Sequence, residues 1–295
     1  MMKGKVMEYR TDSLTRKAYA KINLGLDVVR RLENGYHEVR MIMQTVGICD
    51  VLTFRVAQSG IRITADSREL PVNEDNLIYK AARLLMETCG VKAGADIYLE
   101  KHIPIAAGMA GGSSDAAAAL QGLNELFALG LSQEQLRQMG VRIGADVPYC
   151  IMGGTALAEG IGEILTPLPP APRCSLLIAR PDIQVSTRYV YEHLDAVETQ
   201  THPDIDGILS AIRDGDLAGI TSRLGNVLER VTAEKYPVID RIKQEMLLSG
   251  AMGSLMSGSG PTVFGIYGSK EQARAARDNL ERTGLAGAFF VTELV

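Results

Sequence analysis

The sequence has no excess of basic residues. Its 295 residues include 31 Lys and Arg against 35 Asp and Glu, a formal net charge of −4. Proteins that bind nucleic acids carry a basic surface that neutralises the phosphate backbone. This composition gives no sign of such a surface, so we expect a small-molecule partner and no nucleic acid.

Cysteine is scarce, and the four present, at positions 49, 89, 150 and 174, are far apart in the sequence. Their spacing fits no zinc motif. Widely separated single cysteines are typical of proteins kept in a reducing compartment. We therefore expect reduced and mostly buried thiols, neither a disulfide nor a structural metal, and a cytoplasmic location.

Long apolar runs are also missing. Residues 1–12 mix charged and apolar side chains and lack the continuous apolar core of a signal peptide, which indicates a short leader. The longest uncharged run, residues 246–269, contains six glycines, five serines and Pro261. This composition favours a turn-rich loop over a membrane helix, and we expect no membrane partner.

The first half of the chain begins with strand patterns and continues with a helix. Residues 18–54 alternate β-branched and polar side chains, and Asn34-Gly35 predicts a two-residue hairpin turn. Asp75 is placed to cap a helix whose apolar positions recur at helical spacing and which ends before Gly90.

The middle of the chain has the order that a phosphate site needs. Residues 96–100 predict a strand, residues 106–112 a turn of small residues, and residues 113–129 a helix rich in alanine. A turn of this kind brings backbone N–H groups to the start of a helix, where anions bind. Residues 144–148 then predict the beginning of a loop.

Four prolines fall within residues 166–172, a composition that neither a helix nor a central strand tolerates. We place a domain boundary there, giving an N-terminal domain over 1–168 and a C-terminal domain over 169–295. The second domain is expected to be α+β with ferredoxin-like packing, because its strands and helices alternate. The elements predicted are strands over 175–179, 262–267 and 288–293 and a helix over 270–282, besides several amphipathic helices.

The small-residue stretch Pro104–Asp115 carries the strongest chemical signal. It lacks the lysine of a Walker A loop and does not match the dinucleotide-binding pattern. Its small side chains let backbone N–H groups approach a polyphosphate, and the first turn of the following helix favours negative charge. By itself, the stretch is equally well explained as a tight turn between a strand and a helix.

Two further stretches are ambiguous when taken alone. Residues 256–265 form a second small-residue loop that runs into an apolar strand, a pattern typical of a structural turn. Lys21 stands on a predicted strand among apolar neighbours, where a lysine commonly points to solvent and discourages edge pairing.

Together, in this order and spacing, the three stretches resemble the signature motifs of the GHMP kinases, the family of galactokinase, homoserine kinase, mevalonate kinase and phosphomevalonate kinase. With residues 34–38 (Asn-Gly-Tyr-His-Glu) and 144–148 (Gly-Ala-Asp-Val-Pro), the chain is similar to the members that act on a cytidine-diphosphate-linked polyol. The resemblance covers residues from about 18 to the last predicted strand. It implies an α+β, two-domain GHMP kinase fold, with an N-terminal ribosomal-protein-S5-like nucleotide domain and a C-terminal ferredoxin-like domain.

The resemblance implies transfer of the γ-phosphoryl group of ATP to the 2-hydroxyl of that polyol in the non-mevalonate pathway to isoprenoid precursors. ATP and Mg²⁺ are the cofactors expected, and the chain is expected to be a monomer or weak homodimer. Two alternatives stay open: another GHMP small-molecule kinase of the homoserine or mevalonate type, and a catalytically silent ligand-binding protein on the same fold. Residues 34–37 argue against the first, and the presence of both Lys21 and Asp146 argues against the second.

The same resemblance assigns the site residues. Asp146 is the implied catalytic base, already ionised at pH 7, although it could instead cap a helix. Lys21 is the implied electrostatic helper beside it. The residues implied to bind the acceptor are Asn23, Tyr36, His37, Thr187 and Tyr191. The residues implied to bind the nucleotide are Asn76, Lys101, Pro104, Ile105, Ala106, Ala107, Gly108, Met109, Ala110, Gly111, Gly112, Ser113, Ser114 and Asp115; no acidic residue is assigned to the metal.

One departure from the family concerns the phosphate loop, which is often richer in glycine. This chain has alanine at three of its positions, Ala106, Ala107 and Ala110. Alanine is strained where the backbone needs a positive φ, because its Cβ approaches the carbonyl oxygen. Either φ is negative at these positions or the loop has another shape.

Overall fold

The structure is a computed structural model that describes residues 13–194 and 202–295, and the predicted leader over 1–12 lies outside them. The described chain divides into two compact units. Unit 1 comprises residues 13–19, 49–103 and 111–152; unit 2 comprises residues 20–48, 104–110 and, with the gap, 153–295. The predicted division after residue 168 does not coincide with these boundaries, because two long strands contribute residues to both units.

The two long strands are β1 (Ser13–Arg31) and β2 (His37–Ala57), which are neighbours in the sheet. The hairpin that joins them was predicted, but its loop has three residues rather than two. Leu32 N donates to Tyr36 O at 2.7 Å, and Gly35 adopts a φ of 84°. A glycine in the left-handed region at the last position is what a three-residue hairpin loop requires.

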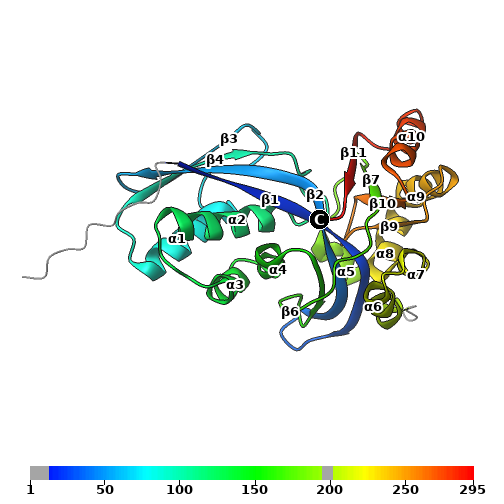
Figure 1. The fold of residues 1–295 in the computed structure, drawn as a ribbon, viewed down its shortest axis with the longest axis horizontal. Coiled ribbons are helices and arrows are strands. Elements are labelled where there is room, and N and C mark those ends of the chain that lie inside the picture. Colours follow the sequence, from blue (N-terminus) through cyan, green and yellow to red (C-terminus); the bar gives the residue numbers. More distant parts are fainter. Residues whose placement is uncertain (1–12, 195–201) are drawn as a thin grey trace, which may run out of the picture. The chain divides into compact units, whose positions relative to one another are not determined.

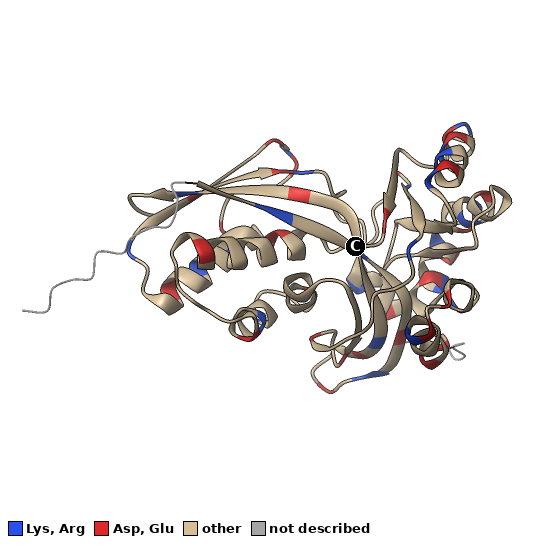
Figure 2. Cartoon of the chain, in the orientation of Figure 1, with Lys and Arg blue, Asp and Glu red and all other residues tan. Residues whose placement is uncertain are grey.

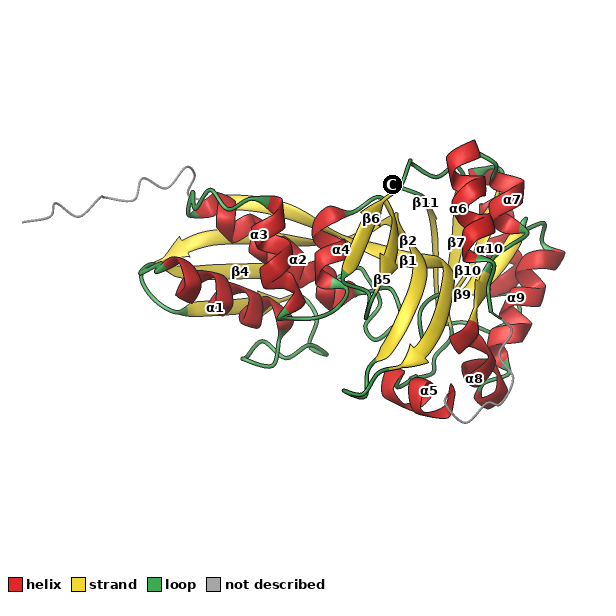
Figure 3. Ribbon diagram, turned by 90° about the horizontal axis from the view of Figure 1, so that it is seen from below, coloured by secondary structure: helices red, strands yellow, loops and turns green. Residues whose placement is uncertain are grey.

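Unit 1 is a sheet with helices on one face (Figure 1). The end of β2 pairs antiparallel with β4 (Gly94–Glu100), and β4 pairs parallel with β3 (Ile61–Ala65). Helices α1 (Leu77–Cys89) and α2 (Gly111–Leu126) bury their apolar faces against this sheet and run side by side (Figure 3). The remaining helices of the unit are α3 (Gln133–Val141) and α4 (Val147–Met152).

The helix ends of unit 1 correct three sequence predictions. The N-cap of α1 is Asn76 and not Asp75, because Asn76 has the extended backbone of a cap and its Oδ1 accepts from Ile78 N at 2.8 Å. Helix α2 ends at Leu126 rather than near residue 129, since Ala128 adopts a left-handed φ of 50°. The loop expected over 144–148 gives way to α4 from Val147.

Unit 2 contains a four-stranded antiparallel sheet in the order β11-β7-β10-β9. With helices between β7 and β9 and between β10 and β11, this is the predicted ferredoxin-like arrangement. The run 246–269, predicted as a turn-rich loop apart from the strand over 262–267, also holds the end of α9 and the strand β9. The elements are β7 (Ser175–Arg180), α5 (Thr187–Leu194), α6 (Ile205–Asp214), α7 (Leu217–Thr221), α8 (Val227–Lys235), α9 (Val238–Leu248), β9 (Gly253–Met256), β10 (Val263–Tyr267), α10 (Lys270–Glu281) and β11 (Ala288–Glu293).

Short strands complete unit 2 on either side of the long hairpin. The first part of β2 pairs with β5 (Thr155–Glu159), which pairs with β6 (Ile164–Pro167). Because β6 is an edge strand, it accommodates a proline at its end. On the other side, β8 (Gly225–Asn226) runs parallel to β1, with Asn226 opposite Leu26.

Charged residues of both signs are interspersed along the helices of each unit (Figure 2). In the part of the chain that the structure describes, no helix combines the length and the apolar character that crossing a bilayer demands.

Candidate active site

Lys21 is buried in β1 and is not the solvent-pointing edge lysine that its sequence context also allowed. Its side chain is 5% exposed, and its Nζ donates to Asn23 Oδ1 at 2.8 Å. Because side chains two apart on a strand point to the same face, the sequence Lys-Ile-Asn brings these two together. Asn23 Nδ2 in turn donates to Met41 Sδ at 3.3 Å. The result is an ammonium held in a fixed position by a buried amide.

The strand that carries Lys21 also holds the phosphate loop, residues 104–110. Lys21 N donates to Met109 O at 3.1 Å. Ser257 Oγ donates to the preceding carbonyl of the loop, Gly108 O, at 3.0 Å. Unit 2 therefore brings together three segments that the sequence singled out separately: the lysine strand, the small-residue loop and residues 256–260.

The backbone of the phosphate loop is shaped to expose N–H groups. Ala106, Gly108 and Ala110 have φ values of 53°, 72° and 56°. Residues in the left-handed region therefore alternate along the loop with residues that are not. Successive N–H groups in such a backbone form an anion-binding concavity. Within the described residues, Gly108, Met109 and Ala110 donate no backbone hydrogen bond to the protein. These groups fit the oxygen atoms of a polyphosphate.

The alanines of this loop resolve the question raised by the sequence. Ala106 and Ala110 lie in the left-handed region, and Ala107 does not. The loop therefore keeps a conformation suited to glycine at two positions where the chain has alanine, at a cost of about 1–2 kcal/mol each.

Unit 1 contains a buried charge cluster at the end of β4. Lys101 Nζ forms ion pairs with Asp50 and, at 2.8 Å, with Asp115, and its side chain is 5% exposed. Asp50 Oδ1 also accepts from His102 N at 2.6 Å and Ile103 N at 2.7 Å. Asp50 was missed by the sequence analysis, and only its place after an apolar run in β2 could have suggested it. The cluster fixes the chain immediately before the phosphate loop.

Two charges confined around one ammonium perturb each other. Burial raises the pKa of Asp115 to about 7, against the attraction of Lys101 and with a further rise from Asp50. Asp115 Oδ1 is buried without a hydrogen-bond partner in the described residues. Lys101 and Asp115, both predicted to contact nucleotide, are thus bound to each other and to Asp50.

Three other predicted nucleotide residues have distinct surroundings. Asn76 uses both ends of its amide, since Oδ1 caps α1 and Nδ2 donates to Pro71 O at 2.7 Å. Ser114 Oγ donates to Tyr19 O at 2.7 Å and so ties α2 to β1. Ser113 lies beside the segment that contains Asp146: a Cβ placed on Gly144 would be 3.9 Å from Ser113 Oγ.

Asp146 immediately precedes α4 and is half-buried. Its backbone carbonyl accepts from Cys150 N at 3.0 Å. Its carboxylate makes no hydrogen bond or ion pair within the described residues, so the capping bond that the alternative interpretation requires is not formed.

The five predicted acceptor residues fall into small groups within unit 2. Asn23 lies with Lys21, as described. The rings of His37 and Tyr191 are in contact, with centroids 4.9 Å apart and an interplanar angle of 31°. The hydroxyls of Thr187 and Ser259 are hydrogen-bonded at 2.8 Å. Tyr36, at the hairpin, is 60% exposed.

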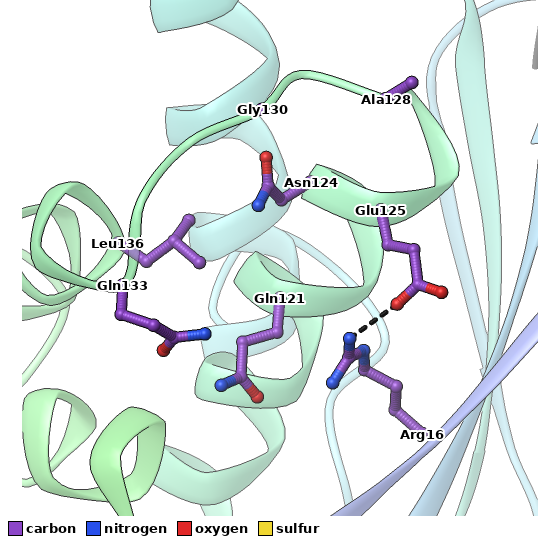
Figure 4. Close-up of a pocket in the computed structure, with 8 residues that line it drawn as sticks. All are labelled: Arg16, Gln121, Asn124, Glu125, Ala128, Gly130, Gln133 and Leu136. Atoms are coloured by element: carbon purple, nitrogen blue, oxygen red, sulfur yellow. Dashed lines mark hydrogen bonds and ion pairs between the residues drawn. The ribbon is translucent and has the colours of Figure 1, made fainter.

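A separate pocket of about 310 Å³ lies in unit 1 between α2, α3 and the start of β1 (Figure 4). Arg16 and Glu125 form an ion pair at its wall. None of the residues that line this pocket belongs to the predicted site. The lining residues are Arg16, Gln121, Asn124, Glu125, Ala128, Gly130, Gln133 and Leu136.

Comparison with known proteins identifies two family matches. Residues 76–154 match the GHMP kinases N terminal domain, and residues 201–286 match the GHMP kinases C terminal domain. The two matches lie on either side of the division predicted after residue 168. They also contain the phosphate loop, Asp146 and residues 256–265.

Individual relatives are similar over nearly the whole chain. A 4-diphosphocytidyl-2-C-methyl-D-erythritol kinase from Lachnospira eligens is 54% identical over 96% of this chain and 98% of its own length. The crystal structure of a 4-(cytidine 5'-diphospho)-2C-methyl-D-erythritol kinase matches with a TM-score of 0.82 and 33% identity, covering 95% of this chain and 99% of its own. Homoserine kinase from Cytophaga hutchinsonii, at 22% identity and a TM-score of 0.78 over 98% and 96% of the two chains, shares the fold.

Proposed function

Because this chain belongs to the GHMP kinase family, we propose that it transfers the γ-phosphoryl group of ATP to the 2-hydroxyl of 4-diphosphocytidyl-2-C-methyl-D-erythritol. The observation that carries this proposal is the 54% identity to a kinase named for that acceptor over 96% of the chain. The homoserine kinase match, at 22% identity, speaks for the fold alone and does not favour the alternative acceptor. The product feeds the non-mevalonate pathway to isoprenoid precursors.

Asp146 is the proposed base. In phosphoryl transfer the acceptor oxygen attacks the γ-phosphorus, the bond from that phosphorus to the β,γ-bridging oxygen breaks, and ADP leaves. The hydroxyl proton passes to the Asp146 carboxylate, and this role is supported by the fact that the carboxylate accepts no hydrogen bond from described residues. A carboxylate committed to a helix cap would be a weaker acceptor of that proton.

Lys21 is the proposed electrostatic partner of the reaction. Its ammonium is desolvated, so its interaction with developing negative charge is stronger than it would be in water. The hydrogen bond to Asn23 limits the positions that the ammonium can adopt. Preorganisation of this kind means that little rearrangement is needed as charge develops.

The residues of the phosphate loop suit a triphosphate. The N–H groups of Gly108, Met109 and Ala110 and those of the first turn of α2 are the proposed donors to its oxygens. Lys101 and Asp115 are also proposed to contact the nucleotide, and within the described residues their charged groups form an ion pair with each other.

Mg²⁺ is proposed as the second cofactor. The described residues contain no group of three or more His, Cys, Asp or Glu able to hold a metal. Mg²⁺ in kinases is held largely by phosphate oxygens and water, with one or two protein ligands. When bound, the ion neutralises charge on the β- and γ-phosphates. Ser113, whose hydroxyl forms no described hydrogen bond, is the proposed protein contact.

The acceptor is proposed to bind through Asn23, Tyr36, His37, Thr187 and Tyr191. The His37 and Tyr191 rings, in contact with each other, present aromatic surface suited to cytosine. Stacking on a base contributes about 1–3 kcal/mol.

Turnover with Mg-ATP, measured with the cytidyl acceptor, homoserine and mevalonate in parallel, tests the proposal. Phosphorylation of the cytidyl acceptor alone is expected. Asp146→Asn should lower kcat by about 10²- to 10⁴-fold with an unchanged melting temperature. Turnover of another acceptor would overturn the substrate, and near-normal kcat in the Asn variant would overturn the base.

A further inference from the structure

We propose that Asn226, which no signature motif contains, is a positioning residue for the nucleotide. It lies in unit 2, where it is the last residue of β8 and the N-cap of α8, and 9% of it is exposed. Its amide anchors residues 256–260, here named the bracing loop, and the bracing loop holds the phosphate loop 104–110. The inference rests on the proposed use of ATP and adds the residue that fixes the phosphate loop.

The amide of Asn226 is fully engaged. Its Nδ2 donates to two carbonyls of the bracing loop, Met256 O and Gly258 O, each at 2.8 Å. Its Oδ1 accepts from Leu228 N at 3.0 Å and thereby caps α8. One side chain therefore joins the start of a helix to both sides of Ser257. Removing one partner of such buried hydrogen bonds costs free energy, because it leaves the other partner unsatisfied.

The bracing loop contacts the phosphate loop through backbone atoms and through the Ser257 hydroxyl. Ser257 Oγ donates to Gly108 O, and a Cβ placed on Gly108 would lie 2.3 Å from Ser257 O. A Cβ placed on Gly258 would lie 3.1 Å from Gly108 O. The two backbones are in direct contact, so a shift of the bracing loop displaces Gly108.

Asn226 also lies in the strand that pairs with β1, the strand of Lys21. It stands opposite Leu26 in the parallel pairing of β8 with β1. On the same strand, Lys21 N donates to Met109 O. The phosphate loop is thus held at Gly108 by the bracing loop and at Met109 by β1, and Asn226 fixes the bracing loop relative to β1.

Other side chains hold the ends of the bracing loop. Glu229 Oε2 accepts from Met256 N at 2.7 Å, and Thr232 Oγ1 donates to Ser259 O at 3.1 Å. Both residues are in α8, the helix that Asn226 caps. Asn226 therefore acts on the loop directly, through its two donors, and indirectly, through the helix.

The variant Asn226→Asp separates these two roles. Aspartate has the same shape and is as good an N-cap as asparagine, so the bond to Leu228 N is kept. It has no N–H donors, and it places a carboxylate oxygen against the carbonyls of Met256 and Gly258. The control is Ser269→Ala, which removes the capping box of α10 elsewhere in unit 2 and leaves the bracing loop intact.

Two measurements test the role. In steady-state kinetics, Asn226→Asp should raise the KM for ATP about tenfold and change the KM for the cytidyl acceptor less than about twofold. In hydrogen exchange without ligand, the Lys21 amide, which donates to Met109 O, and the Gly260 amide, which donates to Ser257 O, should exchange faster than in the unsubstituted protein. Ser269→Ala should lower the melting temperature but leave the KM for ATP and both exchange rates unchanged.

The two readouts separate failure of this inference from failure of the proposed function. If the unsubstituted protein transfers phosphate and Asn226→Asp changes neither the KM for ATP nor the exchange of the Lys21 and Gly260 amides, the positioning role is wrong. If Ser269→Ala produces the same changes, the effect is general destabilisation and the role is again wrong. If the unsubstituted protein does not use ATP but exchange of the Lys21 and Gly260 amides rises only in Asn226→Asp, the positioning of the phosphate loop by Asn226 stands and the proposed function fails.

Discussion

The ammonium of Lys21 lies 2.8 Å from Oδ1 of Asn23, and the two residues are 5% and 0% exposed. A buried charge is tolerated only when its hydrogen bonds are made inside the protein. The pair therefore links the stability of β1 to the position of the group proposed to stabilise the transferring phosphate.

Replacing Asn23 by Ala should remove this acceptor and leave the Lys21 ammonium under-bonded. We expect the free energy of unfolding, measured by urea denaturation, to fall by about 1–3 kcal/mol. We also expect kcat to fall, because the ammonium is no longer fixed. Asn23→Asp, which keeps an acceptor oxygen at the same place, is the matched variant and should lose less stability. Equal stability in Asn23→Ala and the unsubstituted protein would contradict the structural role of the pair.

The Asp115 carboxyl should make stability depend on pH. Its folded pKa, about 7, is above the ordinary value of 3.8, so the folded state binds this proton more tightly than the unfolded state. Stability therefore falls as pH rises from about 4 through 7 and levels off above that range. Asp50 and Lys101 share the cluster, and their protonation is linked to that of Asp115. We therefore expect the free energy of unfolding to change by roughly 1–3 kcal/mol over this pH range.

Asp115→Asn is the variant that checks this dependence. It keeps an oxygen acceptor for Lys101 and cannot ionise, so its urea midpoint should exceed that of the unsubstituted protein at pH 8, and the two should converge near pH 5. A parallel pH dependence in both proteins would show that another group is responsible.

The left-handed alanine at position 110 should be a source of strain. Ala110→Gly is expected to raise the free energy of unfolding by up to about 1 kcal/mol, since relief of the Cβ clash exceeds the added entropy of the unfolded chain. Ala107→Gly is the control in the same loop. Ala107 is not in the left-handed region and is buried, so its replacement should destabilise. Thermal denaturation of both variants gives the answer, and a loss of stability in Ala110→Gly would refute the strain.

Local signals in the sequence determined many elements of the fold. The helix ending before Gly90, a strand over 96–100, observed as 94–100, and the ferredoxin-like order of the second half follow from periodicity and glycine position. The errors have local causes too. Asn76 and Asp75 are equally good caps by residue type, and only backbone geometry selects one. Residues 253–256 were hidden among glycines and serines that also suit a loop.

The sequence alone also indicated the family, because its three motifs are short contiguous stretches whose residue types are set by chemistry. What only the tertiary structure decided is how distant residues meet. Lys21 could have been an exposed edge lysine until its burial was known, and Asp50 carries no motif. Asn226 stands more than 100 residues from the phosphate loop in sequence, yet it controls that loop's support through two hydrogen bonds. Periodicity reports which face of an element is apolar, whereas the pairing of buried polar groups depends on contacts between segments that no local pattern records.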